Sequence, residues 1–192
     1  ADELEGELFR DDLRHINTDS DSEILLNIFA HELQEQNKLR LAPEDIFKAV
    51  AGVHRRCRGA YAAVAMIIGC GVVAFRDRFG IRPLVFGHMG ERSEAQWVVS
   101  SETCGLDIIG ASFDGDVEPG EIMHFRLGDP EPTRSRWITE PAKLCVFEMI
   151  YFARPDSRFF GESLYSYRVR IGEVLARETP VEADIVIGVP DS

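Results

Sequence analysis

One stretch separates two kinds of pattern in the sequence: Cys145-Val-Phe-Glu-Met-Ile-Tyr-Phe-Ala-Arg-Pro-Asp-Ser157. Its first half, Val146 to Ala153, is mostly apolar. Its second half is a polar exit in which Pro155 removes a backbone donor and disfavours helix at Arg154. A segment of this kind is typical of a buried strand or of a domain junction. We therefore expect the organisation of the chain to change here.

The residues before this stretch predict two helices and then about five strands. Apolar side chains from Ile24 to Leu33 fall on one helical face, and Ser20 with Glu23 forms a capping-box pattern. Pro43 opens the second helix. The predicted strands and turns follow in this order: a strand buried on both faces at 61–68, strands at 72–75, 83–86 and 96–100, a short helix or turn at 103–109, and a strand at 121–126. This is an antiparallel, layered α+β pattern.

The residues around and after the stretch predict a linker and the start of another domain. Residues 131–143 are polar and rich in proline, which is typical of a linker. Apolar residues spaced through 164–175 predict a helix, and 183–189 reads as a buried strand. A helix followed by such a strand is typical of an α/β domain with a parallel sheet.

Composition excludes several classes of function. The 192 residues carry a net charge of −12, which weighs against nucleic acid and anionic membrane surfaces as partners. No apolar run approaches the roughly 20 residues of a membrane span. No C-x-x-C pair occurs among the four cysteines, so there is no zinc-finger or redox signature. Without a recognisable secretory signal, we expect reduced thiols and a cytoplasmic location. The densest basic group, residues 54–58, is interpreted as a solvated helix end.

Three stretches together resemble the amidophosphoribosyltransferases, which are class II glutamine amidotransferases of the N-terminal-nucleophile hydrolase type. They are His15-Ile-Asn-Thr-Asp-Ser-Asp-Ser-Glu23, Phe75-Arg-Asp-Arg-Phe-Gly-Ile-Arg-Pro-Leu84 and residues 145–157. The second stretch departs from the family where Arg78-Phe79 replaces the more usual Pro-Asn. The resemblance follows one order along nearly the whole chain.

The resemblance implies a fold in two parts. Residues 1–140 would be the C-terminal part of a glutaminase domain, a partial αββα N-terminal-nucleophile sandwich. Residues 141–192 would begin an α/β type I phosphoribosyltransferase domain. The implied reaction transfers ammonia from glutamine to phosphoribosylpyrophosphate, which gives 5-phosphoribosylamine in the first step of de novo purine synthesis. Mg²⁺ would serve the transferase site, and the intact enzyme would be a homo-oligomer.

The same resemblance assigns roles to individual residues. Asp21 would bind the α-amino group of glutamine, although a helix-stabilising carboxylate explains it too. Tyr151 would line an ammonia channel or simply pack in a core. Cys145 would ligate a 4Fe-4S cluster or act as a small buried hydrophobe. Asp191 and Ser192 would approach the phosphoribosylpyrophosphate or form an ordinary turn.

The resemblance also implies that essential parts lie outside this sequence. Residue 1 is alanine rather than the nucleophilic cysteine, and no Asn-Gly pair supplies an oxyanion hole. We therefore expect a fragment of a longer protein, inactive in isolation, with its catalytic cysteine upstream. Two alternatives remain open at this point: another class II amidotransferase, or a non-catalytic binding module that retains the sandwich.

Overall fold

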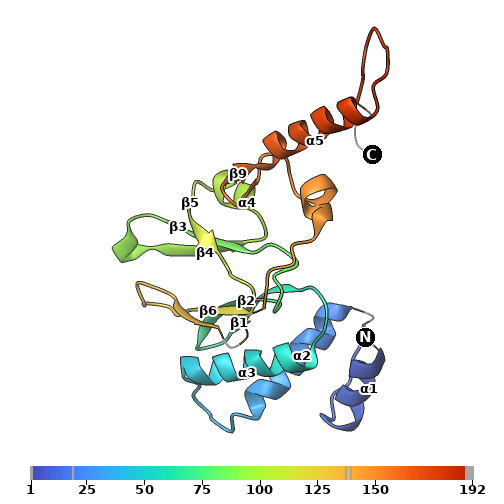
Figure 1. The fold of residues 1–192 in the computed structure, drawn as a ribbon. Coiled ribbons are helices and arrows are strands. Elements are labelled where there is room, and N and C mark those ends of the chain that lie inside the picture. The colour runs from blue at the N-terminus through green and yellow to red at the C-terminus, as the bar shows by residue number, and fades with distance from the viewer. Residues whose placement is uncertain (1, 19, 137, 139, 189–192) are drawn as a thin grey trace. The chain divides into compact units, whose positions relative to one another are not determined.

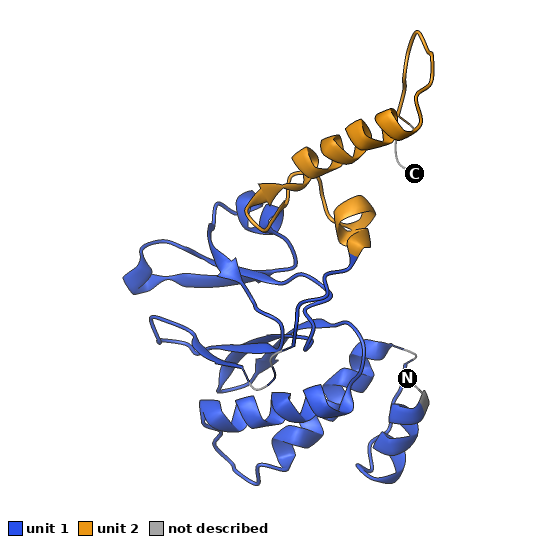
Figure 2. Ribbon diagram, viewed as in Figure 1, with its two compact units in different colours: residues 1–145 blue, residues 146–192 orange. Residues whose placement is uncertain are grey.

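The computed structural model describes every residue except 1, 19, 137, 139 and 189–192 (Figure 1). The chain separates into two compact units, residues 1–145 and residues 146–192 (Figure 2). Among the described residues, the first unit contains helices α1–α4 and two sheets. The second contains a helical turn, a two-stranded ribbon and helix α5.

Two paired helices cover one face of the first sheet (Figure 1). The helices that precede the first strand are α1 (Asp2–Arg10), α2 (Asp21–Gln34) and α3 (Pro43–Arg56). Ser20 caps α2 as predicted, because its side chain accepts a hydrogen bond from the Ser22 amide. Pro43 lies at the start of α3. Ile28 and Ile46 are fully buried, so the apolar faces seen in the sequence do form a core.

The first sheet is antiparallel throughout and has the strand order β1-β2-β6-β7. Its strands are β1 (Ala62–Ile67), β2 (Gly71–Arg76), β6 (Glu121–Phe125) and β7 (Thr133–Arg136). Phe75 and Ile122 point into the core beneath α2 and α3. Ala74 and Met123, next to them in sequence, belong to a second core on the opposite face. The sheet is therefore packed on both sides over its central strands.

The second sheet has the order β4-β3-β5, with a short 3-10 helix, η1 (Arg92–Glu94), before β4. Its strands are β3 (Val85–Met89), β4 (Gln96–Ser100) and β5 (Ser112–Asp116). Phe86 enters the core between the sheets, whereas its neighbour Val85 packs with Leu106 of α4 (Thr103–Ile108). The layers are thus helices, sheet, sheet and helix, which confirms the predicted α+β class.

The prediction for residues 61–68 is wrong in one respect. The strand forms, but only one of its faces is covered. Val64 and Met66 are 52% and 79% exposed, and they alternate with partly buried residues. The reason is that β1 lies at the edge of the four-stranded sheet, beyond the part that the three-stranded sheet covers. A continuous run of apolar residues in the sequence does not distinguish an edge strand from a central strand.

The predicted linker at 131–143 also needs correction. Residues Thr133–Arg136 form β7, which pairs with β6. Its sequence, Thr-Arg-Ser-Arg, has no apolar alternation because the strand is at the sheet edge and mostly exposed. Strand β5 was missed for the same reason, since it too lies at a sheet edge and is largely exposed. Helix α1 was not predicted either, although Leu4 and Leu8 fall one helical turn apart and pack on the core.

In the second unit, the stretch 145–157 is not a buried strand. It forms a π-helical turn, η2 (Glu148–Phe152), and then a tight turn that ends at the buried Ser157. Strands β8 (Arg158–Phe159) and β9 (Glu162–Ser163) form a small ribbon, and α5 (Leu164–Glu178) confirms the predicted helix. The boundary between the two units falls between Cys145 and Val146.

The predicted buried strand at 183–189 is not found among the described residues 183–188. Ile185, Val186 and Ile187 are 76–90% exposed there. A strand needs a neighbouring strand to which it is hydrogen-bonded. Among the described residues, no strand pairs with this segment. As for membranes, no helix in the described part of the chain is both long and apolar enough to cross one.

Candidate functional site

The side chain of Glu23 holds the loop that leads into α2. Glu23 accepts hydrogen bonds from the backbone amides of Asn17 and Thr18, at 2.9 and 2.8 Å, and from the Thr18 hydroxyl at 2.6 Å. These bonds, the one from the Thr18 hydroxyl first, lower the pKa of Glu23 from 4.5 to about 2. The sequence suggested that Glu23 would bond to the cap residue Ser20. Instead it fixes the loop at Asn17 and Thr18, six and five residues before Glu23.

Asp21 lies in the first turn of α2, just after this loop. Its side chain is exposed, and no described residue forms a hydrogen bond or ion pair with its carboxylate. The carboxylate stands at the positive end of the helix dipole, where a negative charge stabilises the helix. A charged acceptor that is held on a fixed backbone and has no internal partner can receive an ammonium group from a ligand. The geometry therefore permits the predicted contact with an amino group.

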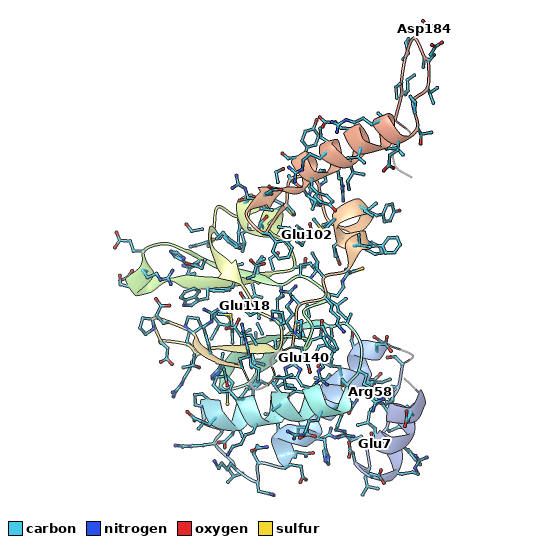
Figure 3. The ribbon with its side chains drawn as sticks, in the orientation of Figure 1. Glu7, Arg58, Glu102, Glu118, Glu140 and Asp184 are labelled. Atoms are coloured by element: carbon cyan, nitrogen blue, oxygen red, sulfur yellow. The ribbon has the colours of Figure 1, made fainter. Side chains whose placement is uncertain are left out.

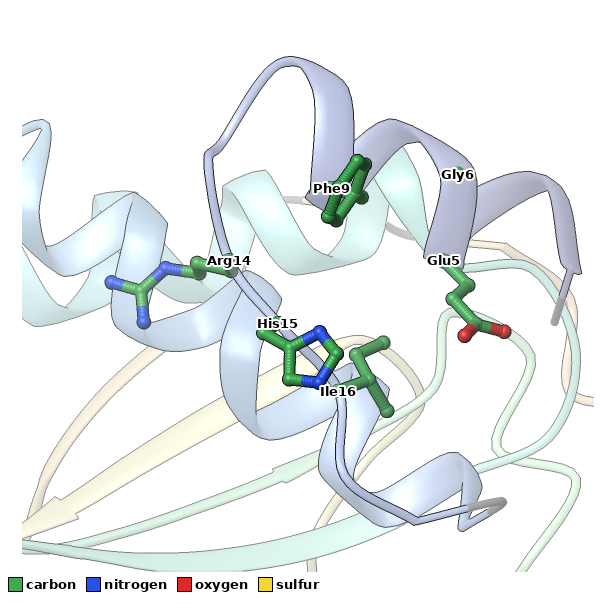
Figure 4. A pocket seen from close by; sticks show the side chains of 6 residues that line it. All are labelled: Glu5, Gly6, Phe9, Arg14, His15 and Ile16. Carbon is green, nitrogen blue, oxygen red and sulfur yellow. The ribbon is translucent and has the colours of Figure 1, made fainter.

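A hollow of about 370 Å³ lies beside the same loop, between α1 and residues 14–16 (Figure 4). Phe9 and Ile16 supply its apolar surface, and Glu5, Arg14 and His15 supply polar groups. The Arg14 guanidinium points away toward α2, where it bonds to the Gln34 side chain. The loop is thus supported by Glu23 on one side and by Arg14 on the other.

The turn at residues 76–82 is an internal scaffold. Arg76 is 7% exposed and donates to the carbonyl oxygens of Gly80 and Val117, both at 2.8 Å, and of Arg82. Asp77 is fully buried and accepts from the amides of Phe79 and Ile81. Because these polar groups are occupied by backbone partners, the motif serves as a structural turn. Arg76 and Asp77 therefore have few hydrogen-bonding groups left to bind a substrate.

The same turn anchors the chain that leaves the first unit. Lys143 donates its amide to the Phe79 carbonyl at 2.9 Å, and its ammonium lies 4.4 Å from the centre of the Phe79 ring. The amide of Cys145 bonds to Ile81 in the same way. Phe79, the residue that departs from the family pattern, therefore takes part in holding this segment. No local sequence pattern indicates this contact.

Tyr151 lies on the turn η2 of the second unit and is 59% exposed. Its ring meets Phe152 at 5.5 Å in an edge arrangement, and Phe147 contacts Phe152 in turn. Within the described part of the chain, Tyr151 is therefore not buried in a core. Its predicted role in a channel stays a prediction.

Cys145 is a free, half-buried thiol. Within the described parts of the chain, no group of three or more histidine, cysteine or acidic residues could hold a metal ion. An iron–sulfur cluster needs four thiolates, and the described residues do not bring the cysteines together in that way. The residues present thus do not by themselves fit a cluster. Asp191 and Ser192 fall outside the described residues.

Comparisons with known proteins settle the relationship. No family model matches the sequence. The amidophosphoribosyltransferase of Pseudomonas aeruginosa is 45% identical over an alignment that covers 100% of this chain and 39% of that protein. The one from Escherichia coli is 46% identical with the same coverage. The chain belongs to the amidophosphoribosyltransferase family.

Solved structures agree with this assignment. The glutamine phosphoribosylpyrophosphate amidotransferase of B. subtilis, solved with ADP and GMP, superposes with a TM-score of 0.81 at 33% identity. That match covers 100% of this chain and 38% of the other. The present chain thus spans about two fifths of the length of these amidophosphoribosyltransferases. The layered first unit is a partial αββα sandwich of the N-terminal-nucleophile type.

Proposed function

We propose that the protein that carries this chain transfers ammonia from glutamine to phosphoribosylpyrophosphate and so makes 5-phosphoribosylamine, the first step of de novo purine synthesis. One observation carries the proposal: about 45% identity to amidophosphoribosyltransferases runs through the whole chain. Glutamine and phosphoribosylpyrophosphate are the substrates that this activity requires. We propose the cytoplasm as its compartment, because the cysteine pattern of the sequence predicts reduced thiols.

The proposal divides the work between two domains. Residues 1–140 would form part of the glutaminase domain, and 141–192 would begin the phosphoribosyltransferase domain, where Asp191 and Ser192 approach the substrate. Mg²⁺ would act at that second site. An iron–sulfur cluster that includes Cys145 would need ligands other than the described residues.

Asp21 is the residue of this chain that we propose for glutamine recognition. Its exposed carboxylate has no partner among the described residues and lies at the end of a loop fixed by Glu23. An ammonium group from the substrate would gain a charge-assisted hydrogen bond there. The roles of Asp21 as ligand and as helix-stabilising residue are compatible, because an exposed carboxylate in the first turn of a helix can do both.

The test is a steady-state comparison in the full-length protein, with glutamine as the varied substrate. Asp21→Asn should raise KM for glutamine about ten- to a hundred-fold, as expected for the loss of one charged hydrogen bond of roughly 1.5–3 kcal/mol. Synthesis from added ammonium salt should not change, because that route bypasses glutamine.

Glu44→Gln is the matched control. Glu44 is an exposed acid in the first turn of α3, so its loss removes the same kind of helix–dipole contact without touching the loop before α2. Equal changes in KM for the two variants would leave Asp21 with only a helix-stabilising role. Absence of any glutamine-dependent synthesis in the wild-type full-length protein would overturn the proposed function itself.

A further inference from the structure

A second hollow, of about 540 Å³, lies between α1 and the end of α3. Four arginines line it: Arg10, Arg55, Arg56 and Arg58. The other described lining residues are Glu3, Leu4 and Glu7. Figure 3 labels two of the lining residues, Glu7 of α1 and Arg58, which follows α3. The lining itself carries four positive and two negative charges, and the nearby carboxylates of Asp12 and Glu32 pair with Arg56 and Arg55.

Two of the four arginines form ion pairs with described residues, and the other two do not. Arg56 forms a 2.7 Å ion pair with Asp12, and Arg55 approaches Glu32 at 3.8 Å. Arg10 and Arg58, in contrast, are exposed and have no hydrogen bond or ion pair with any described residue. Two complete guanidinium groups are therefore available at the hollow.

Arg56 adds a third unused donor. Its Nε atom is buried and has no hydrogen-bond acceptor among the described residues. A buried donor without a partner is energetically unfavourable, so a ligand that supplied an acceptor would relieve that cost. The side chain cannot easily turn away, because its Nη2 is held by Asp12 and lies 3.8 Å from Glu7.

Charge and shape restrict what this hollow can hold. Guanidinium groups match the oxygens of phosphate in a forked geometry, which favours phosphate over a single-point acceptor. Arg10 and Arg56 lie at the ends of α1 and α3, where the negative ends of the helix dipoles oppose any bound anion. An anion that engages several guanidinium groups at once offsets this repulsion, which favours a compact polyphosphate over a lone carboxylate.

Extended polyanions fit poorly. Nucleic acid and anionic membranes would bring the rest of an acidic protein close to further negative charge. A nucleoside base would need an apolar or aromatic wall, whereas the described lining has no aromatic ring and Leu4 as its apolar side chain. We propose that this hollow binds a compact polyphosphate anion through Arg10 and Arg58, with Arg56 at its base.

The ligand would also join two elements that are otherwise held together sparingly. Leu8 is the fully buried side chain of α1 among the described residues, and Arg56 supplies the ion pairs that link α1 and the following loop to α3. An anion bound to Arg10 on one side and Arg58 on the other would add a cross-link. Binding should therefore stabilise α1 in its place. This site does not depend on the proposed enzyme activity.

The experiment uses the 192-residue chain, with inorganic tripolyphosphate and inorganic phosphate as probes in isothermal titration calorimetry at low ionic strength with EDTA. We expect saturable 1:1 binding of tripolyphosphate, weaker binding of phosphate, and a rise in melting temperature with ligand concentration. Arg10→Gln and Arg58→Gln should each weaken binding at least fivefold, and the double variant should abolish it.

Arg40→Gln is the matched control, because Arg40 is exposed, has no described partner and lines no described hollow. Its dissociation constant should stay within twofold of wild type. Circular dichroism checks that each variant keeps its fold. The proposal is overturned if wild type shows no saturable binding, if Arg40→Gln weakens binding as much as Arg58→Gln, or if the double variant still binds.

Discussion

Helices α3 and α5 have almost the same length, 14 and 15 residues, yet they differ in what covers them. Helix α3 buries nine of its residues against α2 and the first sheet. Helix α5 buries only Leu164 among the described residues, and its apolar positions Val174 and Leu175 are 47% and 60% exposed. Both helices show apolar spacing in the sequence. The comparison shows that such spacing predicts a helix and its apolar face but not whether a surface is present to cover that face.

The largest expected effect tests whether the first unit holds a closed core. Phe75 is fully buried, and its ring lies within about 6 Å of those of Phe29, His54 and Tyr61. Phe75→Ala should reduce the free energy of unfolding by about 3–5 kcal/mol, measured by urea denaturation with tryptophan fluorescence and circular dichroism.

Leu175→Ala in α5 is the companion variant. It should change the free energy of unfolding by no more than about 0.5 kcal/mol, because the side chain is already 60% exposed. Equal costs for the two substitutions would show that α5 is covered as well as α3, and would remove the contrast between the units.

The second effect uses a buried titrating group. His54 is 1% exposed, its Nδ1 lies 2.7 Å from the Tyr61 hydroxyl, and burial lowers its pKa from 6.5 to about 4. Between these values the unfolded chain binds a proton that the folded chain does not. Stability should therefore be complete above pH 6.5 and should fall by up to about 3 kcal/mol as the pH drops toward 4.

Urea denaturation at several pH values between 7.5 and 4 measures this slope. His54→Gln should be less stable at neutral pH because the ring contacts are lost, but its stability should depend less on pH in this window. His15→Gln, at an exposed position, should keep the wild-type slope. If His54→Gln and wild type have parallel profiles, His54 is not the group that titrates.

The sequence predicted those parts of the fold in which local pattern and final environment agree. Helices α2, α3 and α5 were found because their apolar spacing is strong, and Ser20 and Pro43 mark two of their starts. The α+β layering followed from the change of period after α3. Strand β7 was missed because an exposed edge strand carries no apolar alternation.

The candidate site was predicted less completely. Asp21 could be named from its motif, but its lack of an internal partner depends on where Glu23 points. The sequence placed Glu23 in a capping box with Ser20, and only the three-dimensional path of the loop shows that it bonds to Asn17 and Thr18. The contact between Phe79 and Lys143 joins residues far apart in the chain, so no local pattern could reveal it.

A third prediction examines how tightly the second sheet is built. A side-chain carbon at Gly87 would lie 2.1 Å from the Ser112 carbonyl oxygen, at the point where the β3–β5 register shifts. Gly87→Ala should cost about 1–3 kcal/mol, because strand backbone has to move. Gly172→Ala in α5 meets no atom within 4 Å, so the same change should be neutral or stabilising there. A neutral Gly87→Ala in thermal melts would show that the sheet adapts.

The smallest effect on stability is expected at Tyr151. There we also expect the largest effect on the coupling between glutamine hydrolysis and phosphoribosylamine synthesis. Because the ring is 59% exposed, Tyr151→Ala should change the free energy of unfolding by no more than about 0.5 kcal/mol. If the ring helps to wall an ammonia path in the full-length enzyme, the variant should still hydrolyse glutamine and should still use added ammonium salt. Only glutamine-dependent synthesis should fall, because ammonia escapes to solvent.

Measuring glutamate and phosphoribosylamine in the same reaction separates this role from others. Phe160→Ala is the control, since Phe160 is an exposed aromatic residue of the same unit, at 79%. The control should keep the wild-type ratio of the two products, whereas Tyr151→Ala should raise glutamate relative to phosphoribosylamine. A wild-type ratio in Tyr151→Ala would exclude Tyr151 from a channel. A parallel fall of all activities with the melting temperature would mean instead that residues outside this chain bury the ring, and that the second unit closes a core of its own as the first one does.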